Sequence, residues 1–269
     1  MQHDIVLIGS GNLATAVGLK LLNSTQNILQ VYSRELPNAK LLAEKLNCEA
    51  INSLDSINKN ASIYLICIKD DAIAEVSQKL SKIISTDKVI AHSSGVNSPD
   101  VIDKSFNRRG LFYPLQSFSR FKIPDWSQIP VFIEGNSETI KILKNLAHKI
   151  SSEVYIMDES IRTHLHLASV FANNFSNYNL VIAKKILDKA YVPFKVLKSL
   201  MVETVEKAFL IDPHDAQTGP AKRGDLHSIE KHIRLLVQEY PEYRSLYKKY
   251  SQIIQQDFKH ENTGSDSTS

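Results

Sequence analysis

The sequence predicts an α/β fold in which a doubly wound parallel sheet comes first and an all-helical region follows. Three observations predict it. Short apolar runs alternate with helical patterns through the first 157 residues, a glycine-rich turn follows the first run, and no strand pattern appears after Met157. Strands that alternate with helices form parallel sheets with right-handed crossovers.

The predicted strands are short apolar runs rich in β-branched residues. They cover residues 4–8, 28–32, 50–51, 62–68, 88–92, 110–118, 130–133 and 153–156. The run 62–68 is apolar on both faces, as a central parallel strand requires. The helices expected between them cover 13–22, 36–46, 71–84 and 137–150, and Pro37 suits the first turn of its helix.

The second half of the chain predicts helices alone. A long helical pattern runs from 161 to 190, Pro193 opens a helix that 203–210 completes, and two more helices cover 228–239 and 242–258. We therefore expect a domain at 1–157, a helical domain at 158–258 and a disordered polar tail at 259–269.

Composition excludes several classes of function. The net charge is +3, and the basic residues are scattered instead of forming the stripe that nucleic acids bind. No apolar run approaches the roughly 18 residues of a membrane span. Cys48 and Cys67 stand alone, and no histidines, acids or thiols group at metal-ligand spacing. We expect a cytoplasmic protein without a metal site.

Residues 9–14 read Gly-Ser-Gly-Asn-Leu-Ala, a GxGxxA pattern between a predicted strand and helix. In this context Gly9 permits the tight turn, and Gly11 lets the backbone approach a pyrophosphate. Ser10, Asn12 and Leu13 then surround an anion held by free N–H groups at the helix start. The alternative is a glycine-rich turn without a ligand. The position within a strand–helix–strand series favours a dinucleotide-binding Rossmann domain.

The second strand ends in Ser33 and Arg34, which favour NADP(H) as the cofactor. NAD-selective sites usually place an acid here to bind the ribose hydroxyl. A guanidinium can instead bind a 2′-phosphate through two hydrogen bonds, and a serine can donate to it. The alternative is an exposed arginine at a strand end.

Segments rich in polar residues also lie at the ends of two later strands and in a third segment that points back toward the same edge, where cofactor and substrate bind in such folds. They contribute Ile68 and Lys69 beside the cofactor, Ser93 and Ser94 in a Ser-Ser-Gly turn, and Tyr113 and Gln116 toward the substrate. Ser94 is a candidate for orienting the reacting polar group. Plain turn chemistry is the alternative for this serine pair.

The long helix carries a polar stripe among apolar residues. At 3.6 residues per turn, His166, Ser169, Asn173 and Asn177 share one face. His166 is a candidate general acid because imidazole titrates near neutrality, and Asn173 is a candidate for orienting a carbonyl. The alternative is a core histidine with interhelical amides.

A Gly-Pro-rich segment at 215–225 is a candidate clamp for an anionic substrate. Its candidate ligands are Thr218, Arg223 and Asp225. The alternative is a helix–helix turn with solvated charges.

Five separated segments resemble one family: GSGNLA, HSSGVNSPDV, YPLQSFS, HLHLASVFANNFSN and AQTGPAKRGD. From about Ile5 to about Tyr250 the chain is similar to Rossmann-like plus DUF2520 proteins, within the 6-phosphogluconate dehydrogenase-like and pyrroline-5-carboxylate reductase-like oxidoreductases. The resemblance implies an NADP-dependent oxidoreductase with a helical second domain that often forms a homodimer. Many relatives carry a lysine and an asparagine on the first long helix. Here His166 and Asn173 stand there, so a lysine-based mechanism is not transferred.

The sequence thus predicts an NADP(H)-dependent oxidoreductase that transfers hydride between nicotinamide and a small carbonyl, imine or hydroxy compound, with Arg223 holding a substrate anion. The alternative is a non-enzymatic NADP(H)-binding sensor or regulatory dimer. A scaffold that has lost its cofactor conflicts with the intact glycine pattern.

Overall fold

The computed structural model describes residues 2–119 and 124–259. The chain forms two compact units, Met1–Asn179 and Leu180–Ser269, and the division falls inside a helix, after the end of the sheet near Met157. The predicted disordered tail lies outside the described residues, apart from Lys259.

The first unit is built on a sheet with the strand order β3-β2-β1-β4-β5-β6-β7-β8. Its strands are β1 (Asp4–Ile8), β2 (Asn27–Tyr32), β3 (Glu49–Ile51), β4 (Ile63–Ile66), β5 (Val89–His92), β6 (Arg108–Pro114), β7 (Val131–Gly135) and β8 (Val154–Ile156). All neighbouring pairs are parallel except β6 and β7, which are antiparallel. The predicted parallel sheet is therefore confirmed with this one exception.

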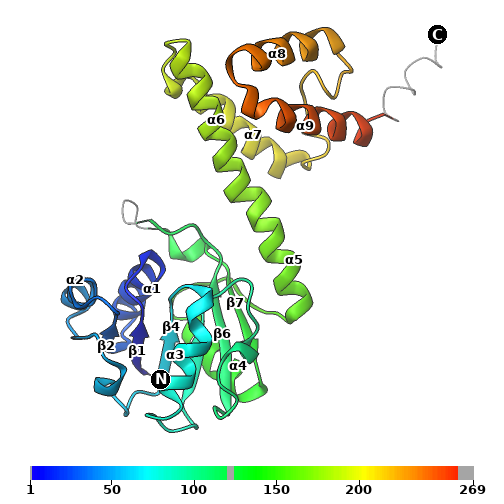
Figure 1. Ribbon diagram of the computed structural model, residues 1–269. Coiled ribbons are helices and arrows are strands. Elements are labelled where there is room, and N and C mark those ends of the chain that lie inside the picture. Colours follow the sequence, from blue (N-terminus) through cyan, green and yellow to red (C-terminus); the bar gives the residue numbers. More distant parts are fainter. Residues whose placement is uncertain (1, 120–123, 260–269) are drawn as a thin grey trace. The chain divides into compact units, whose positions relative to one another are not determined.

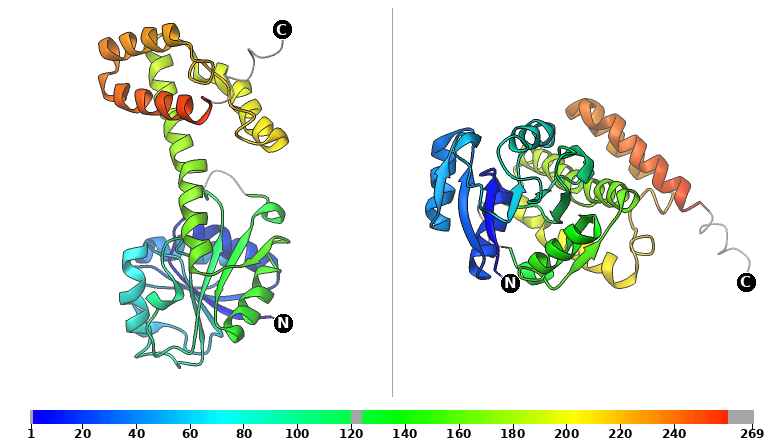
Figure 2. Two further views of the ribbon diagram at one scale, coloured as in Figure 1. Left: turned by 90° about the vertical axis from the view of Figure 1, so that its right-hand side faces the viewer. Right: turned by 90° about the horizontal axis from the view of Figure 1, so that it is seen from below.

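Helices cover both faces of the sheet, as a doubly wound fold requires. Figures 1 and 2 show α1 (Asn12–Asn23) and α2 (Leu36–Leu46) on one face and α3 (Ile73–Leu80) on the other. α4 (Ser137–Ala147) packs into the same hydrophobic core as α1 and α2. Alternate residues of β1 serve the two cores: Ile5 and Leu7 enter the first, and Val6 and Ile8 the second.

Several predicted elements were too long, and two of them overran the observed ends by four residues. The strand expected at 110–118 ends at Pro114, where its antiparallel pairing with Val131 stops. The helix expected at 71–84 begins as a 3₁₀ turn at Asp70–Ala72 and is α-helical only over Ile73–Leu80. Apolar periodicity does not stop where backbone pairing stops, which explains both errors.

Beyond β8, the described residues form helices and loops. The helices are α5 (Glu159–Ser169), α6 (Ser176–Lys189), α7 (Lys198–Ile211), α8 (Leu226–Glu239) and α9 (Arg244–Asp257). In the second unit α8 and α9 lie side by side (Figure 1), and Leu236 packs with Tyr240 and Tyr243 against Ile182 and Ile186 of α6. None of the helices in the described part is long and apolar enough to cross a membrane.

A π-helical segment, Val170–Phe175, interrupts the long helix predicted at 161–190. Ser176 confirms the wider turn, because its Oγ donates to the carbonyl oxygen of Phe171, five residues back, at 3.1 Å. A π turn takes in an extra residue, so the positions beyond it rotate by about 100° relative to a continuous α-helix. The face predicted for His166, Asn173 and Asn177 assumed a regular α-helix, and the π-helical segment rotates Asn177 away from it.

Candidate cofactor cleft and active site

The turn after β1 requires glycine at position 9. Gly9 has a φ of +124°, and a Cβ atom there would lie 2.2 Å from the carbonyl oxygen of Cys67. The Gly9 N–H donates to the carbonyl oxygen of Tyr32 at 2.8 Å. The turn thus packs directly against the residue after β4 and hydrogen-bonds to the end of β2.

The second glycine leaves open space at the start of α1. Gly11 is the N-cap of this helix and no side chain caps it. A Cβ atom at Gly11 would meet no atom within 4 Å. The first N–H groups of an uncapped helix are free donors at its positive end, which suits a pyrophosphate. This part of the chain therefore fits a dinucleotide.

Ser33 and Arg34 follow β2 beside the same turn. The Ser10 hydroxyl donates to Oγ of Ser33 at 3.0 Å, which links the glycine turn to the end of β2. Arg34 is exposed, and no hydrogen bond or ion pair joins it to another described residue. Its guanidinium is therefore available for a phosphate group of a ligand.

A cleft of about 660 Å³ joins these features. Nine of the ten residues predicted to bind the cofactor line it; they are Gly9, Ser10, Gly11, Asn12, Leu13, Ser33, Arg34, Ile68 and Lys69. Ser93 is the exception, although its Oγ lies 3.6 Å from Sγ of Cys67, which does line the cleft. Sequence reasoning missed the wall that α3 supplies through Glu75 and Val76, because apolar spacing shows only the buried side of a helix.

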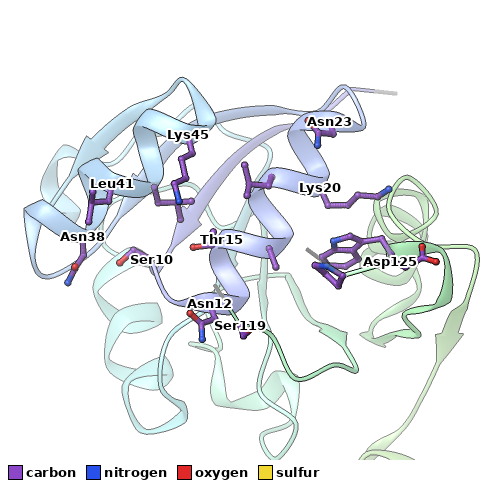
Figure 3. A pocket seen from close by; sticks show the side chains of 15 residues that line it. Ser10, Asn12, Thr15, Lys20, Asn23, Asn38, Leu41, Lys45, Ser119 and Asp125 are labelled. Carbon is purple, nitrogen blue, oxygen red and sulfur yellow. The ribbon is translucent and has the colours of Figure 1, made fainter. Parts of the chain in front are cut away.

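A larger groove of about 920 Å³ runs along α1 and α2 (Figure 3). It includes Thr15 and Lys20 of α1 and Leu41 and Lys45 of α2. It shares Ser10 and Asn12 with the cleft, but contains neither glycine of the turn, nor Ser33, nor Arg34. We assign the cofactor to the smaller cleft because the free helix N-terminus and the guanidinium lie there.

His92 organises the turn after β5 and was given no role in the sequence analysis. Its ring is buried at the strand end. The Ser94 N–H donates to Nδ1 at 3.1 Å, and Nε2 lies 3.0 Å from the carbonyl oxygen of Ser98. Since Nδ1 accepts, Nε2 carries the proton and donates to Ser98. The His92 ring is therefore neutral when it holds the turn in place.

We expect stability to fall as the pH decreases from 6.5 to 4, in part because of His92. Burial lowers its pKa to about 4, against about 6.5 in an unfolded chain. Between pH 6.5 and 4 the unfolded state binds more protons than the folded state. Acidification over this range therefore lowers the free energy of unfolding by about 3 kcal/mol. Urea unfolding at a series of pH values checks this. The stability difference between wild type and His92→Asn should shrink toward pH 4; a constant difference would contradict the assignment.

The structure gives Ser94 a different task from the predicted one. Its side chain is 3% exposed. Oγ accepts hydrogen bonds from the backbone N–H groups of Val96 and Asn97, at 3.2 and 3.0 Å. A buried hydroxyl that accepts two backbone hydrogen bonds stabilises the turn. The geometry therefore favours the turn-chemistry alternative over an orienting role.

The same turn brings His166 and Tyr113 together. A Cβ atom at Gly95 would lie 2.4 Å from Nδ1 of His166 and 3.0 Å from Oη of Tyr113. Gly95 is buried beneath these two side chains. Only a residue without a Cβ allows a histidine of α5 and a tyrosine of β6 to approach one point on the backbone. Two predicted site residues, far apart in sequence, are thus neighbours.

A buried ion pair holds α5 at this point. Arg162 is 2% exposed and pairs with Glu134 of β7, while its Nε donates to the carbonyl oxygen of Val96 at 3.3 Å. Arg162 precedes His166 by about one helical turn. Its contacts with β7 and with the turn after β5 therefore set the position of His166. No sequence motif pointed to this pair.

The other predicted site residues are placed as follows. Gln116 is exposed, and its Oε1 accepts from the Ser117 N–H at 2.8 Å. Asn173 lies in the π-helical segment and is exposed. Thr218 and Arg223 are exposed in the second unit. Asp225 is the N-cap of α8, where its carboxylate accepts from the N–H and hydroxyl of Ser228; this is the helix-turn alternative.

Comparison with known proteins identifies the family. Residues 4–94 match the model "NADP oxidoreductase coenzyme F420-dependent", and residues 129–254 match the domain of unknown function DUF2520. A Bacteroides fragilis protein that carries the name NADP oxidoreductase is 37% identical, with a TM-score of 0.90; the match covers 95% of this chain and 98% of that one. The chain belongs to this NADP oxidoreductase family. The expected family, fold class and NADP(H) dependence are thereby confirmed.

More distant structures share the fold of the oxidoreductase. An imine reductase from Myxococcus stipitatus in complex with NADP⁺ is 13% identical, with a TM-score of 0.70 over 96% of this chain and 94% of that one. A pyrroline-5-carboxylate reductase from Coxiella burnetii is 14% identical, with a TM-score of 0.60 over 97% of this chain and 98% of that one. None of the curated proteins compared with the sequence matches it.

Proposed function

We propose that this oxidoreductase reduces a small carbonyl or imine with NADPH, or catalyses the reverse dehydrogenation, and that His166 handles the proton. The observation that carries the proposal is the meeting of His166 and Tyr113 over Gly95. This point lies in the turn after β5, and β5 is the neighbour of β4, whose end borders the cofactor cleft.

The position of the pair relative to the cleft supports a role at the nicotinamide end of the cofactor. In sheets of this kind the ligand lies outside the carboxyl ends of the strands. The glycine turn, Ser33 and Arg34 suit the phosphates, at the ends of β1 and β2. The contact between Cys67 and Ser93 connects the cleft with the turn that carries Gly95. A cofactor extended along this edge therefore approaches His166.

Each group has a chemical task in the proposal. NADPH supplies the hydride when bound. His166 supplies a proton to the substrate oxygen or nitrogen, which gains charge as its carbon is reduced. Tyr113 lies beside the same point and limits the space around the reacting group. Oxidation uses the same residues in reverse, with His166 accepting the proton.

The substrate class also belongs to the proposal. The names of two distant relatives, an imine reductase and a pyrroline-5-carboxylate reductase, support a carbon–nitrogen or carbon–oxygen double bond as the target. That the substrate is anionic and is bound by Arg223 stays a prediction; this guanidinium is exposed in the second unit. Asp225 is left out of it because its carboxylate caps α8.

A substrate screen tests the proposal. Purified protein with NADPH is offered a panel of small aldehydes, ketones and cyclic imines, with and without a carboxylate, while nicotinamide absorbance is followed. We expect turnover of one class, and His166→Ala should reduce kcat by about 100-fold or more, the range of general acid catalysis. His164→Ala is the matched control, since His164 lies on the same helix with Nδ1 2.8 Å from the Ser160 carbonyl oxygen. Undiminished turnover in His166→Ala would refute its role.

The sensor alternative makes a different forecast. A regulatory protein would bind NADPH without oxidising it in the presence of any member of the panel. The His166–Tyr113 pair favours the enzyme, because a sensor does not need a proton donor beside the nicotinamide.

We also propose that the protein is a homodimer that uses its helical region. The support is a set of large apolar side chains that are exposed on α7 in the single chain; they are Leu200, Val202, Val205, Phe209 and Leu210. Single exposed apolar side chains are ordinary on a soluble monomer, but so many on one helix are typical of a surface that another chain covers. A mass in solution equal to that of one chain would refute the dimer.

A further inference from the structure

Glu75 places a carboxylate in the wall of the cofactor cleft. It lines the cleft together with Ser33 and Arg34, the two residues that suit the 2′-phosphate of NADP(H). A carboxylate repels a phosphate and attracts the guanidinium that binds it. A Glu75 whose charge is not compensated would therefore oppose NADP(H) binding.

The charge of Glu75 is compensated by Lys79, four residues further along α3. Nζ of Lys79 donates to Oε1 of Glu75 at 2.6 Å. A glutamate that precedes a lysine by four residues is the favourable order of such a pair on a helix. Glu75 lies in the first turn of α3 and Lys79 in its last turn, where the helix dipole favours each charge. Their hydrogen bond lowers the pKa of Glu75 and raises that of Lys79, so both groups stay charged at neutral pH.

Arg34 is a second cation within electrostatic reach of the Glu75 carboxylate. Its charge also lowers the pKa of Glu75, to a smaller degree than Lys79 does. No hydrogen bond or ion pair joins Arg34 to another described residue. Of these two cations the carboxylate therefore contacts Lys79, which leaves the guanidinium open to a ligand.

Lys79 itself does not line the cleft. From α3, Glu75 and Val76 belong to the lining described above, and Lys79 does not. The side chains of Glu75 and Lys79 are 67% and 58% exposed, so their ion pair contributes little to the stability of the fold. The pair instead decides where the carboxylate lies. Without Lys79, the Glu75 side chain can turn toward Arg34.

We propose that Lys79 is a positioning residue for cofactor selectivity, which holds Glu75 away from Arg34 so that the guanidinium stays free for the 2′-phosphate of NADP(H). Lys79 acts through Glu75 and does not contact the phosphate. The inference rests on the placement of the 2′-phosphate at Arg34 and is independent of the proposed reaction.

A double-mutant cycle on the full chain tests the proposal. Nicotinamide fluorescence at low salt gives the NADPH and NADH dissociation constants of wild type, Lys79→Met, Glu75→Gln and the double variant. Lys79→Met should weaken NADPH binding by about 5- to 10-fold, because the released carboxylate pairs with Arg34 and repels the phosphate. NADH has no 2′-phosphate, so its affinity should change little. Once Glu75→Gln has removed the carboxylate, the same Lys79→Met substitution should leave NADPH binding almost unchanged.

Lys82→Met is the matched control for the loss of one positive charge. Lys82 is exposed beyond the end of α3 at Leu80, and its charge acts on Asp103. We expect it to weaken NADPH binding by about twofold at most.

Two results would overturn the proposal. Equal losses from Lys79→Met with and without Glu75 would mean that Lys79 contacts the phosphate itself. Undiminished NADPH binding in Lys79→Met would mean that Glu75 does not compete for Arg34. If Arg34→Glu weakens NADPH selectively in that case, the phosphate site stands and this inference alone fails.

Discussion

Replacement of Arg162 by methionine is expected to lower the free energy of unfolding by about 3–5 kcal/mol. Arg162 and Glu134 are 2% and 16% exposed, so the substitution leaves a carboxylate in a largely dry environment without its partner. It also removes the hydrogen bond from Nε to the Val96 carbonyl oxygen. Urea unfolding followed by circular dichroism measures the loss.

A second substitution separates the buried charge from other effects. Arg162→Met combined with Glu134→Leu removes both charges, and a buried pair replaced by apolar residues is often neutral or stabilising. We expect the double variant to recover most of the lost stability. Arg108→Met is the matched control, because Arg108 pairs with Glu138 at the surface, where such pairs contribute about 0–1 kcal/mol. A single variant as stable as wild type would show that the pair does not hold α5.

Replacement of Arg34 by glutamate is expected to weaken NADPH binding by about 100-fold, equivalent to about 3 kcal/mol, while NADH binding changes little. Arg34 lines the cleft beside Ser33; no hydrogen bond or ion pair joins it to another described residue, and Glu75 of the same cleft interacts with it only electrostatically. The substitution removes charge-assisted hydrogen bonds to the 2′-phosphate and adds repulsion. Nicotinamide fluorescence titration with both cofactors gives the two affinities.

Lys40→Glu provides the control for net charge. Lys40 is an exposed residue of α2 that does not line the cleft, so its reversal changes the net charge by the same amount. We expect it to weaken NADPH binding several-fold at most, and less at higher salt. Equal losses in the two variants, or equal losses for NADPH and NADH in Arg34→Glu, would argue against a 2′-phosphate contact at Arg34.

The local sequence determined most of the fold and the position of the cofactor cleft. The alternation of apolar runs and helical patterns gave the strands and helices in the correct order. The GxGxxA turn and the residues after the second strand identified the cleft, because these features depend on neighbours in sequence. Gly9 illustrates this: its positive φ and its contact with Cys67 follow from the tight turn that the pattern predicts.

Tertiary structure decided which polar residues act together. The sequence singled out His166 and Tyr113 separately, but only the packing of α5 against the turn after β5 brought both to Gly95. The same packing created the Arg162–Glu134 pair. The π-helical segment also escaped prediction, since apolar spacing assumes a regular turn. Backbone patterns act over a few residues, whereas burial, ion pairing and the loss of a hydrogen-bond partner depend on elements that meet only in the folded chain.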